Sequence, residues 1–118
     1  MNAKRFSCAI IAMIGFVMPV IASGHQYRLV VKFASECCGT DKASAEQLSN
    51  VISAIEKKLS VKLAIEHVRW GKEGEYNQCF MLQEMNNKMK AAFVAAVKSS
   101  ISSKLVKIEE NSACSGGW

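Results

Sequence analysis

Four cysteines that follow the apolar N-terminal run are the residues best suited to chemistry. Cys37 and Cys38 are adjacent, whereas Cys79 and Cys114 stand apart; the fifth cysteine, Cys8, lies in an apolar N-terminal run. An even number of cysteines in a small chain from an oxidising compartment is typical of a disulfide framework. A bond between the neighbours Cys37 and Cys38 requires a strained small ring. We therefore expect Cys37 and Cys38 to bond with Cys79 and Cys114, in either of the two remaining pairings.

The same thiols allow a second interpretation, in which they handle a metal or exchange with other thiols. Soft metals bind thiolates, and Cys37, Cys38 and Cys79 with His67 nearby would form a candidate ligand set. The Cys-x-x-Cys spacing that is typical of zinc and redox sites is absent. A structural role with no cofactor is therefore the leading interpretation, and a periplasmic thiol- or metal-handling protein is the alternative.

The N-terminus has the three parts of a secretory signal peptide. Lys4 and Arg5 precede an apolar run over 6–22, which ends in small residues that a signal peptidase accepts. We expect residues 1–22 to be removed, with cleavage after Ala22 or after Gly24, so that the exported chain begins at Ser23 or His25. An uncleaved membrane anchor is the rival interpretation. Export to the periplasm or outside the cell would favour disulfide formation.

Length and composition exclude several classes of protein. The chain has 118 residues, of which 50% are hydrophobic, and a net charge of +5 that includes the two bases of the signal. This length suits one small domain over 23–118, and excludes a multidomain enzyme or a multi-span membrane protein. The basic residues are scattered, so nucleic acid is not an expected partner. The expected helices are too rich in Ser and Glu to insert into a membrane after signal cleavage.

The hydrophobic pattern predicts alternating strands and helices. Alternation of apolar and polar residues indicates strands, and apolar residues at helical spacing indicate amphipathic helices. The expected elements are a strand over 26–33, a helix capped by Thr40 or Asp41 and ending near Ser60, strands over 61–69 and 76–83, a helix capped by Asn86 or Asn87 with Ile101 on its apolar face, and a strand over 105–109.

This β-α-β-β-α-β order predicts a fold of the α+β class. With right-handed crossovers it forms a ferredoxin-like sandwich, in which a four-stranded antiparallel sheet of order 4-1-3-2 carries both helices on one face. Many unrelated proteins share this scaffold, so the fold by itself indicates no function.

The same topology predicts where a binding site would lie. The first strand ends at the edge of the sheet where the hairpin between the second and third strands turns. Residues 35–41 and 69–75 would therefore meet there. The candidate binding residues at this edge are Glu36, Asp41, Arg69, Trp70, Lys72, Glu73 and Glu75. Cys79 would also lie there and reach Cys37 or Cys38. Trp70 has two roles open to it, packing on its own core or contacting a partner.

The leading hypothesis is a non-catalytic binding module whose protein or small-molecule partner lies in the cell envelope. A hydrolytic enzyme that uses Glu73, Glu75, Asp41 or His67 ranks last, because the sequence shows no arrangement of nucleophile, base and orienting group.

Overall fold

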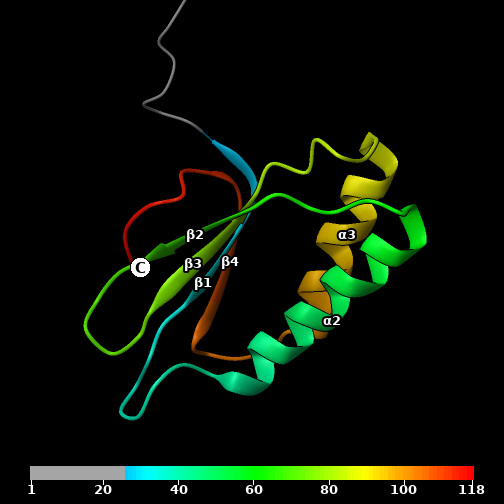
Figure 1. The fold of residues 1–118 in the computed structure, drawn as a ribbon. Helices are drawn as coiled ribbons and strands as arrows, with labels where there is room; N and C mark the ends of the chain where they lie inside the picture. The colour runs from blue at the N-terminus through cyan, green and yellow to red at the C-terminus, as the bar shows by residue number, and fades with distance from the viewer. Residues whose placement is uncertain (1–25) are drawn as a thin grey trace, which may run out of the picture.

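The fold is seen in a computed structural model, which describes residues 26–118. The expected signal segment, residues 1–22, lies outside the described residues. The chain forms an α+β fold with a four-stranded antiparallel sheet and two helices (Figure 1). The elements are β1 (Tyr27–Phe33), α2 (Lys42–Leu59), β2 (Ile65–Arg69), β3 (Tyr76–Phe80), α3 (Asn87–Ser100) and β4 (Val106–Ser112).

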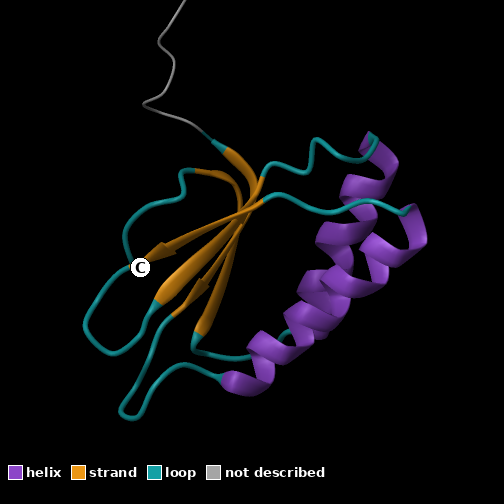
Figure 2. Ribbon diagram, in the orientation of Figure 1, coloured by secondary structure: helices purple, strands orange, loops and turns teal. Residues whose placement is uncertain are grey.

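The strands lie in the order β2-β3-β1-β4, and every neighbouring pair is antiparallel. Both helices lie on one side of the sheet (Figure 2). In the central pair, Phe33 at the end of β1 lies opposite Tyr76 at the start of β3, and Leu29 lies opposite Phe80. The end of β1 and the loop between β2 and β3 are therefore at the same end of the sheet.

The core lies between the sheet and the helices. Leu29, Val31 and Phe33 of β1 alternate towards the helices, where they meet Leu48 of α2 and Phe93 of α3, all of them almost completely buried. A buried aliphatic or aromatic side chain contributes about 1.5–3 kcal/mol of transfer free energy. The predicted period-two and helical patterns both place these residues on the core side.

Asparagine and aspartate side chains fix where the two helices begin. Asp41 caps α2 through its side chain, which accepts hydrogen bonds from the backbone amides of Ala43 (3.1 Å) and Ser44 (3.2 Å). Asn86 caps α3 by accepting from the Met89 amide at 2.9 Å. Such caps satisfy backbone donors that have no partner within the helix. Each cap is one of the two residues expected at its position.

Two strands are shorter than their patterns predict. β2 starts at Ile65 because carboxylates bind the amides before it: Glu56 accepts from Leu63 at 2.9 Å, and Glu84 accepts from Ala64 at 2.8 Å. β3 ends at Phe80, and Leu82 adopts a φ of 60°, which takes the chain out of the extended conformation. β4 instead continues to Ser112, beyond its expected end.

The disulfide pairing differs from the expected one. Cys79 bonds Cys114, with 5.9 Å between their Cα atoms, and Cys37 bonds its neighbour Cys38. The expectation that Cys79 lies beside Cys37 and Cys38 was wrong. Cys79 pairs in register with Val30, in the middle of β1, whereas Cys37 and Cys38 follow the end of that strand. In an antiparallel pair, each step along β3 moves the chain back towards the start of β1, and away from these two cysteines.

The C-terminal segment, residues 113–118, crosses the sheet on the face away from the helices, which we call the back face. Asn77 donates a hydrogen bond of 2.9 Å to the Gly116 carbonyl, and Lys32 donates one of 3.0 Å to the Gly117 carbonyl. Asn77 is fully buried and Lys32 is 7% exposed. Together with the Cys79–Cys114 bond, these contacts hold the segment against the sheet and give buried polar groups their partners.

Candidate functional site

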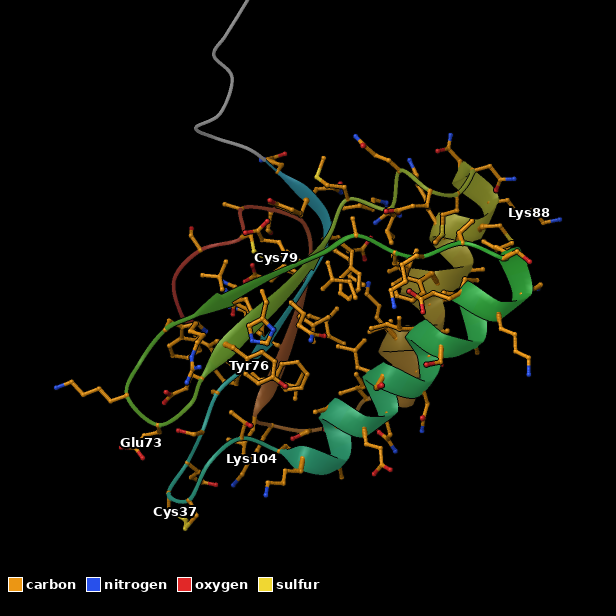
Figure 3. The ribbon with its side chains drawn as sticks, viewed as in Figure 1. Cys37, Glu73, Tyr76, Cys79, Lys88 and Lys104 are labelled. Carbon is orange, nitrogen blue, oxygen red and sulfur yellow. A yellow bond between two sulfur atoms is a disulfide. The ribbon has the colours of Figure 1, made fainter. Side chains whose placement is uncertain are left out.

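The two loops that the sequence placed together do meet. The Ser35 hydroxyl, just after β1, donates a hydrogen bond of 2.7 Å to the carboxylate of Glu75, just before β3. Cys37 and Glu73 lie at this end of the molecule, while Cys79 lies further along the sheet (Figure 3). We call residues 34–41, 70–75 and 101–105 the loop end. The third segment joins it through Leu105, whose carbonyl accepts from the Ala34 amide at 2.8 Å.

Glu75 organises the loop end from inside. Its carboxylate is buried, and it accepts hydrogen bonds from Ser35 and from the backbone amide of Glu73 (2.8 Å). The Ser35 hydroxyl and the amides of Glu75 and Glu73 lower the pKa of Glu75 below its ordinary value. A side chain on Gly71 would collide with this carboxylate. A general acid needs a raised pKa, so Glu75 is built to hold the hairpin rather than to donate a proton.

Asp41 is likewise occupied by structural contacts. The Ser103 hydroxyl lowers the pKa of Asp41 most, followed by the amide and hydroxyl of Ser44, which donates to the carboxylate at 3.0 Å. The carboxylate therefore stays ionised at the N-terminus of α2, where the helix dipole favours negative charge.

The remaining charged candidates are exposed. Glu36 pairs with Lys104 at 3.6 Å, and both side chains are mostly in solvent. Lys72 and Glu73 lie on the exposed turn between β2 and β3, and Arg69 is exposed at the end of β2. An exposed ion pair contributes little to stability, about 0–1 kcal/mol. These groups therefore remain open to another molecule.

Trp70 packs against its own fold. Its indole nitrogen donates a hydrogen bond of 2.8 Å to Oδ1 of Asn77 on the back face. Gly117 lies against the indole ring, and a methyl group there would be 2.7 Å from Cζ3 of Trp70. Trp70 is half-buried between the sheet and the C-terminal segment. Trp70 therefore connects the loop end to the back face of the sheet.

His67 lies in an aromatic row on the helix side of the sheet. Its ring stacks on Tyr76 with centroids 4.7 Å apart, and Tyr76 stacks on Phe33 at 4.6 Å. Burial raises the pKa of Tyr76. The row crosses β2, β3 and β1, and it ends at His67, which is exposed at the edge of the sheet.

The alternative metal ligands are not brought together. Cys79 is bonded to Cys114, and Cys37 and Cys38 are bonded to each other at the loop end. Within residues 26–118, no group of three or more His, Cys, Asp or Glu side chains has a geometry that could hold a metal ion.

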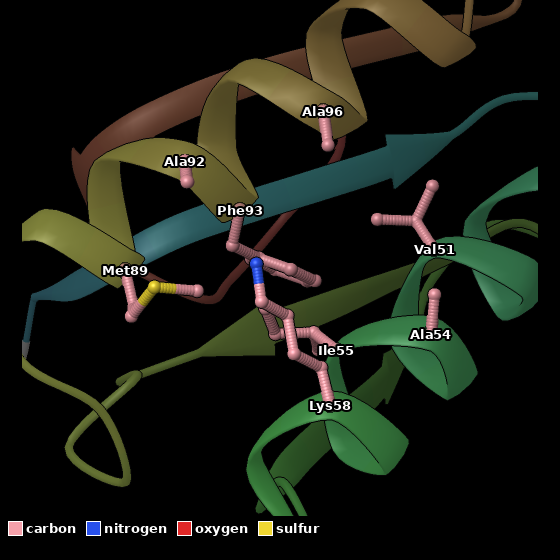
Figure 4. A pocket seen from close by; sticks show the side chains of 8 residues that line it. All are labelled: Val51, Ala54, Ile55, Lys58, Met89, Ala92, Phe93 and Ala96. Atoms are coloured by element: carbon pink, nitrogen blue, oxygen red, sulfur yellow. The ribbon is translucent and has the colours of Figure 1, made fainter.

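Two surface grooves were not foreseen from the sequence. The first, of about 280 Å³, lies between α2 and α3 and is mostly apolar (Figure 4). Alanines line this groove at positions where larger side chains would fill it. The Lys58 side chain extends from α2 across the groove. The second, of about 300 Å³, lies between α2 and the β2 side of the sheet, beside Ile65 and Tyr76. The small residues Ala54, Ala92 and Ala96 in otherwise apolar helix faces are the signal in the sequence for the first groove.

Comparison with models of protein families, with curated proteins and with solved structures finds no match to the chain in any of the three. None of the helices in residues 26–118 combines the length and the apolar character that crossing a membrane requires.

Proposed function

We propose that the protein is an exported, disulfide-stabilised binding module of ferredoxin-like topology, and that its contact surface is the loop end. The observation that carries the proposal is the hydrogen bond between Ser35 and Glu75, which joins two loops far apart in sequence into one ordered surface. Binding surfaces are commonly loops held by a rigid scaffold.

Export is supported by the N-terminal signal pattern and by the cysteines, since disulfides are typical of oxidising compartments. The ferredoxin-like assignment is supported by the order of the elements, by the antiparallel strand pairs and by the position of both helices on one side of the sheet (Figure 2).

Binding is favoured over hydrolysis by what the acidic side chains already do. Asp41 caps a helix and Glu75 holds a hairpin, and the pKa of each is lowered. Of the candidate acids, Glu36 and Glu73 remain exposed to solvent, and no nucleophile or base is arranged around them. The loop end therefore suits recognition of a partner better than proton transfer.

The charges of the loop end indicate the kind of partner. Glu36, Glu73 and Lys72, with Arg69 at the adjoining end of β2, present charges of both signs on one surface. Such a surface suits a protein or small molecule of the cell envelope with charges of both signs, since nucleic acid would require a consistently basic surface.

The proposal is tested by cross-linking. A photo-reactive residue replaces Glu73 at the loop end or, as the matched control, Lys57 on the exposed side of α2. Both variants are exposed to the envelope of the source cell, after circular dichroism has shown that they are folded. Capture of one defined partner from position 73, weakened by Lys72→Ala and absent from position 57, supports the loop end. Capture of that partner from position 57 alone places the contact surface elsewhere.

A thiol-handling function remains the second candidate because of one observation, the exposed Cys37–Cys38 pair at the tip of the first loop. Its metal-binding form has less support, since Cys79 and His67 lie apart from the pair.

A further inference from the structure

We propose that the Cys37–Cys38 pair is a reversible thiol–disulfide site that exchanges with thiols of other exported molecules. The inference does not depend on the binding module. It deepens the second candidate function, thiol handling, and rests on the chemistry and surroundings of the Cys37–Cys38 bond.

The Cys37–Cys38 bond cannot stabilise the fold as a cross-link. It joins residues with a sequence separation of 1, so it closes no loop of the unfolded chain and ties no two elements together. A disulfide stabilises a fold mainly by restricting the unfolded chain, and this effect depends on the length of the closed loop. The Cys79–Cys114 bond spans 35 residues and holds the C-terminal segment on the sheet. The two bonds therefore have different roles.

The loop that carries the pair is anchored without it. Ser35 and Thr40 form an isolated antiparallel bridge on either side of residues 36–39. Ser35 is also bound to Glu75, and Asp41 caps α2 immediately after the bridge. Opening of the disulfide would leave both ends of the loop in place. The fold can therefore survive in the reduced and the oxidised state, as a reversible site requires.

The pair is accessible to another molecule. Glu36, Cys37 and Cys38 are all exposed, and Cys37 lies at the extremity of its loop (Figure 3). An attacking thiolate must reach one sulfur of the disulfide, and exposed disulfides exchange more readily than buried ones. Cys79, by contrast, is fully buried.

The exchanging thiol must come from outside the described part of the chain. Within residues 26–118 all four cysteines are engaged in the two disulfides, and Cys79 lies away from the loop end. The substrate class that fits is a dithiol on a second exported molecule, either a protein with two nearby cysteines or a small dithiol.

The reaction conserves atoms and electrons. One thiolate of the partner attacks the sulfur of one cysteine of the pair and forms a mixed disulfide with it. The Cys37–Cys38 bond breaks, and the other cysteine of the pair leaves as a thiolate. The second thiolate of the partner then attacks the partner's sulfur in the mixed disulfide, forming the partner's disulfide and releasing the second cysteine as a thiolate. Two electrons pass to the pair, the partner is oxidised, and both thiolates take protons from solvent.

The first test is selective reduction of the exported, folded protein. It is treated with dithiothreitol, a small dithiol, quenched at intervals with a maleimide mass tag, and mapped by peptide mass spectrometry. We expect Cys37 and Cys38 to acquire tags at least roughly tenfold faster than Cys79 and Cys114, because exposed disulfides are the labile ones. Circular dichroism should stay unchanged at the stage with two tags. Simultaneous reduction of both disulfides, or earlier reduction of Cys79–Cys114, overturns the proposal.

The second test asks whether the exchange is reversible. The protein is equilibrated with mixtures of reduced and oxidised glutathione, and the state of each pair is read by the same tags. The expected result is a fraction of oxidised Cys37–Cys38 that changes with the glutathione ratio while Cys79–Cys114 stays intact. The variant Cys38→Ser should form a mixed disulfide between glutathione and Cys37. A folded Cys38→Ser protein without that adduct, or a pair that stays oxidised at every ratio, overturns the proposal.

Discussion

The Ser35 hydroxyl donates a hydrogen bond of 2.7 Å to Oε2 of Glu75, a residue 40 positions further along the chain. This contact is the direct link between the first loop and the β2–β3 hairpin. It also makes the loop end sensitive to pH, because its acceptor is a buried carboxylate whose pKa is lowered.

We predict that Glu75 makes the protein less stable in acid. Its folded pKa lies below its ordinary value of 4.5, mainly because of the Ser35 hydroxyl. A lowered folded pKa contributes stability that is complete above the unfolded pKa and is lost as the pH falls through the folded pKa. The melting temperature of the wild type should therefore fall below about pH 4.5, and the fall should be smaller for Ser35→Ala. An equal fall in Ser35→Ala would contradict the role of this hydrogen bond.

We predict that the two disulfides differ in their effect on stability. Cys79→Ser/Cys114→Ser should lower the free energy of unfolding by about 2–5 kcal/mol, since this bond closes a long loop and holds the C-terminal segment. Cys37→Ser/Cys38→Ser should change it by less than about 0.5 kcal/mol, as for an exposed substitution. Urea denaturation under non-reducing conditions measures both values. Equal losses in the two variants would show that the adjacent pair is a structural element after all.

We predict that core truncations in the two helices are costly. Leu48→Ala and Phe93→Ala each remove a side chain that is 1% exposed, and they should cost about 2–5 kcal/mol by leaving a cavity. Glu46→Ala on the solvent side of α2 is the matched control and should cost less than about 0.5 kcal/mol. Thermal denaturation followed by circular dichroism separates the two outcomes. A small loss of stability in Leu48→Ala would show that Leu48 of α2 does not pack against the sheet.

The sequence sufficed to predict the α+β class and the meeting of the two loops, since both follow from hydrophobic periodicity and from the antiparallel register. It did not suffice for the cysteine pairing, because that depends on how far along β3 Cys79 lies. Cys79 follows Tyr76 by three residues, and each residue of a strand advances by about 3.3 Å. This displacement along β3 separates Cys79 from Cys37, and no local sequence pattern indicates it. The role of Trp70 was left open for a related reason: its partners, Asn77 and Gly117, are close only in the fold.

The last prediction concerns the contact between Trp70 and Gly117 on the back face. Gly117→Ala places a methyl group 2.7 Å from Cζ3 of Trp70, so either the indole or the C-terminal segment must move. Because overpacking of this kind typically costs about 1–3 kcal/mol, the variant should unfold at lower urea concentration.

The indole itself reports the movement. Trp118 is 57% exposed and would mask the signal, so the comparison is made in chains that carry Trp118→Phe. In that background, Gly117→Ala should shift the emission of Trp70 to longer wavelength, because displacement of the segment admits water to a ring that is half-buried. Ser115→Ala, at an exposed position of the same segment, is the matched control and should leave both emission and stability unchanged. If Gly117→Ala gives the same emission and stability as Ser115→Ala, the C-terminal segment does not pack on Trp70. The contact between the loop end and the back face would then be disproved.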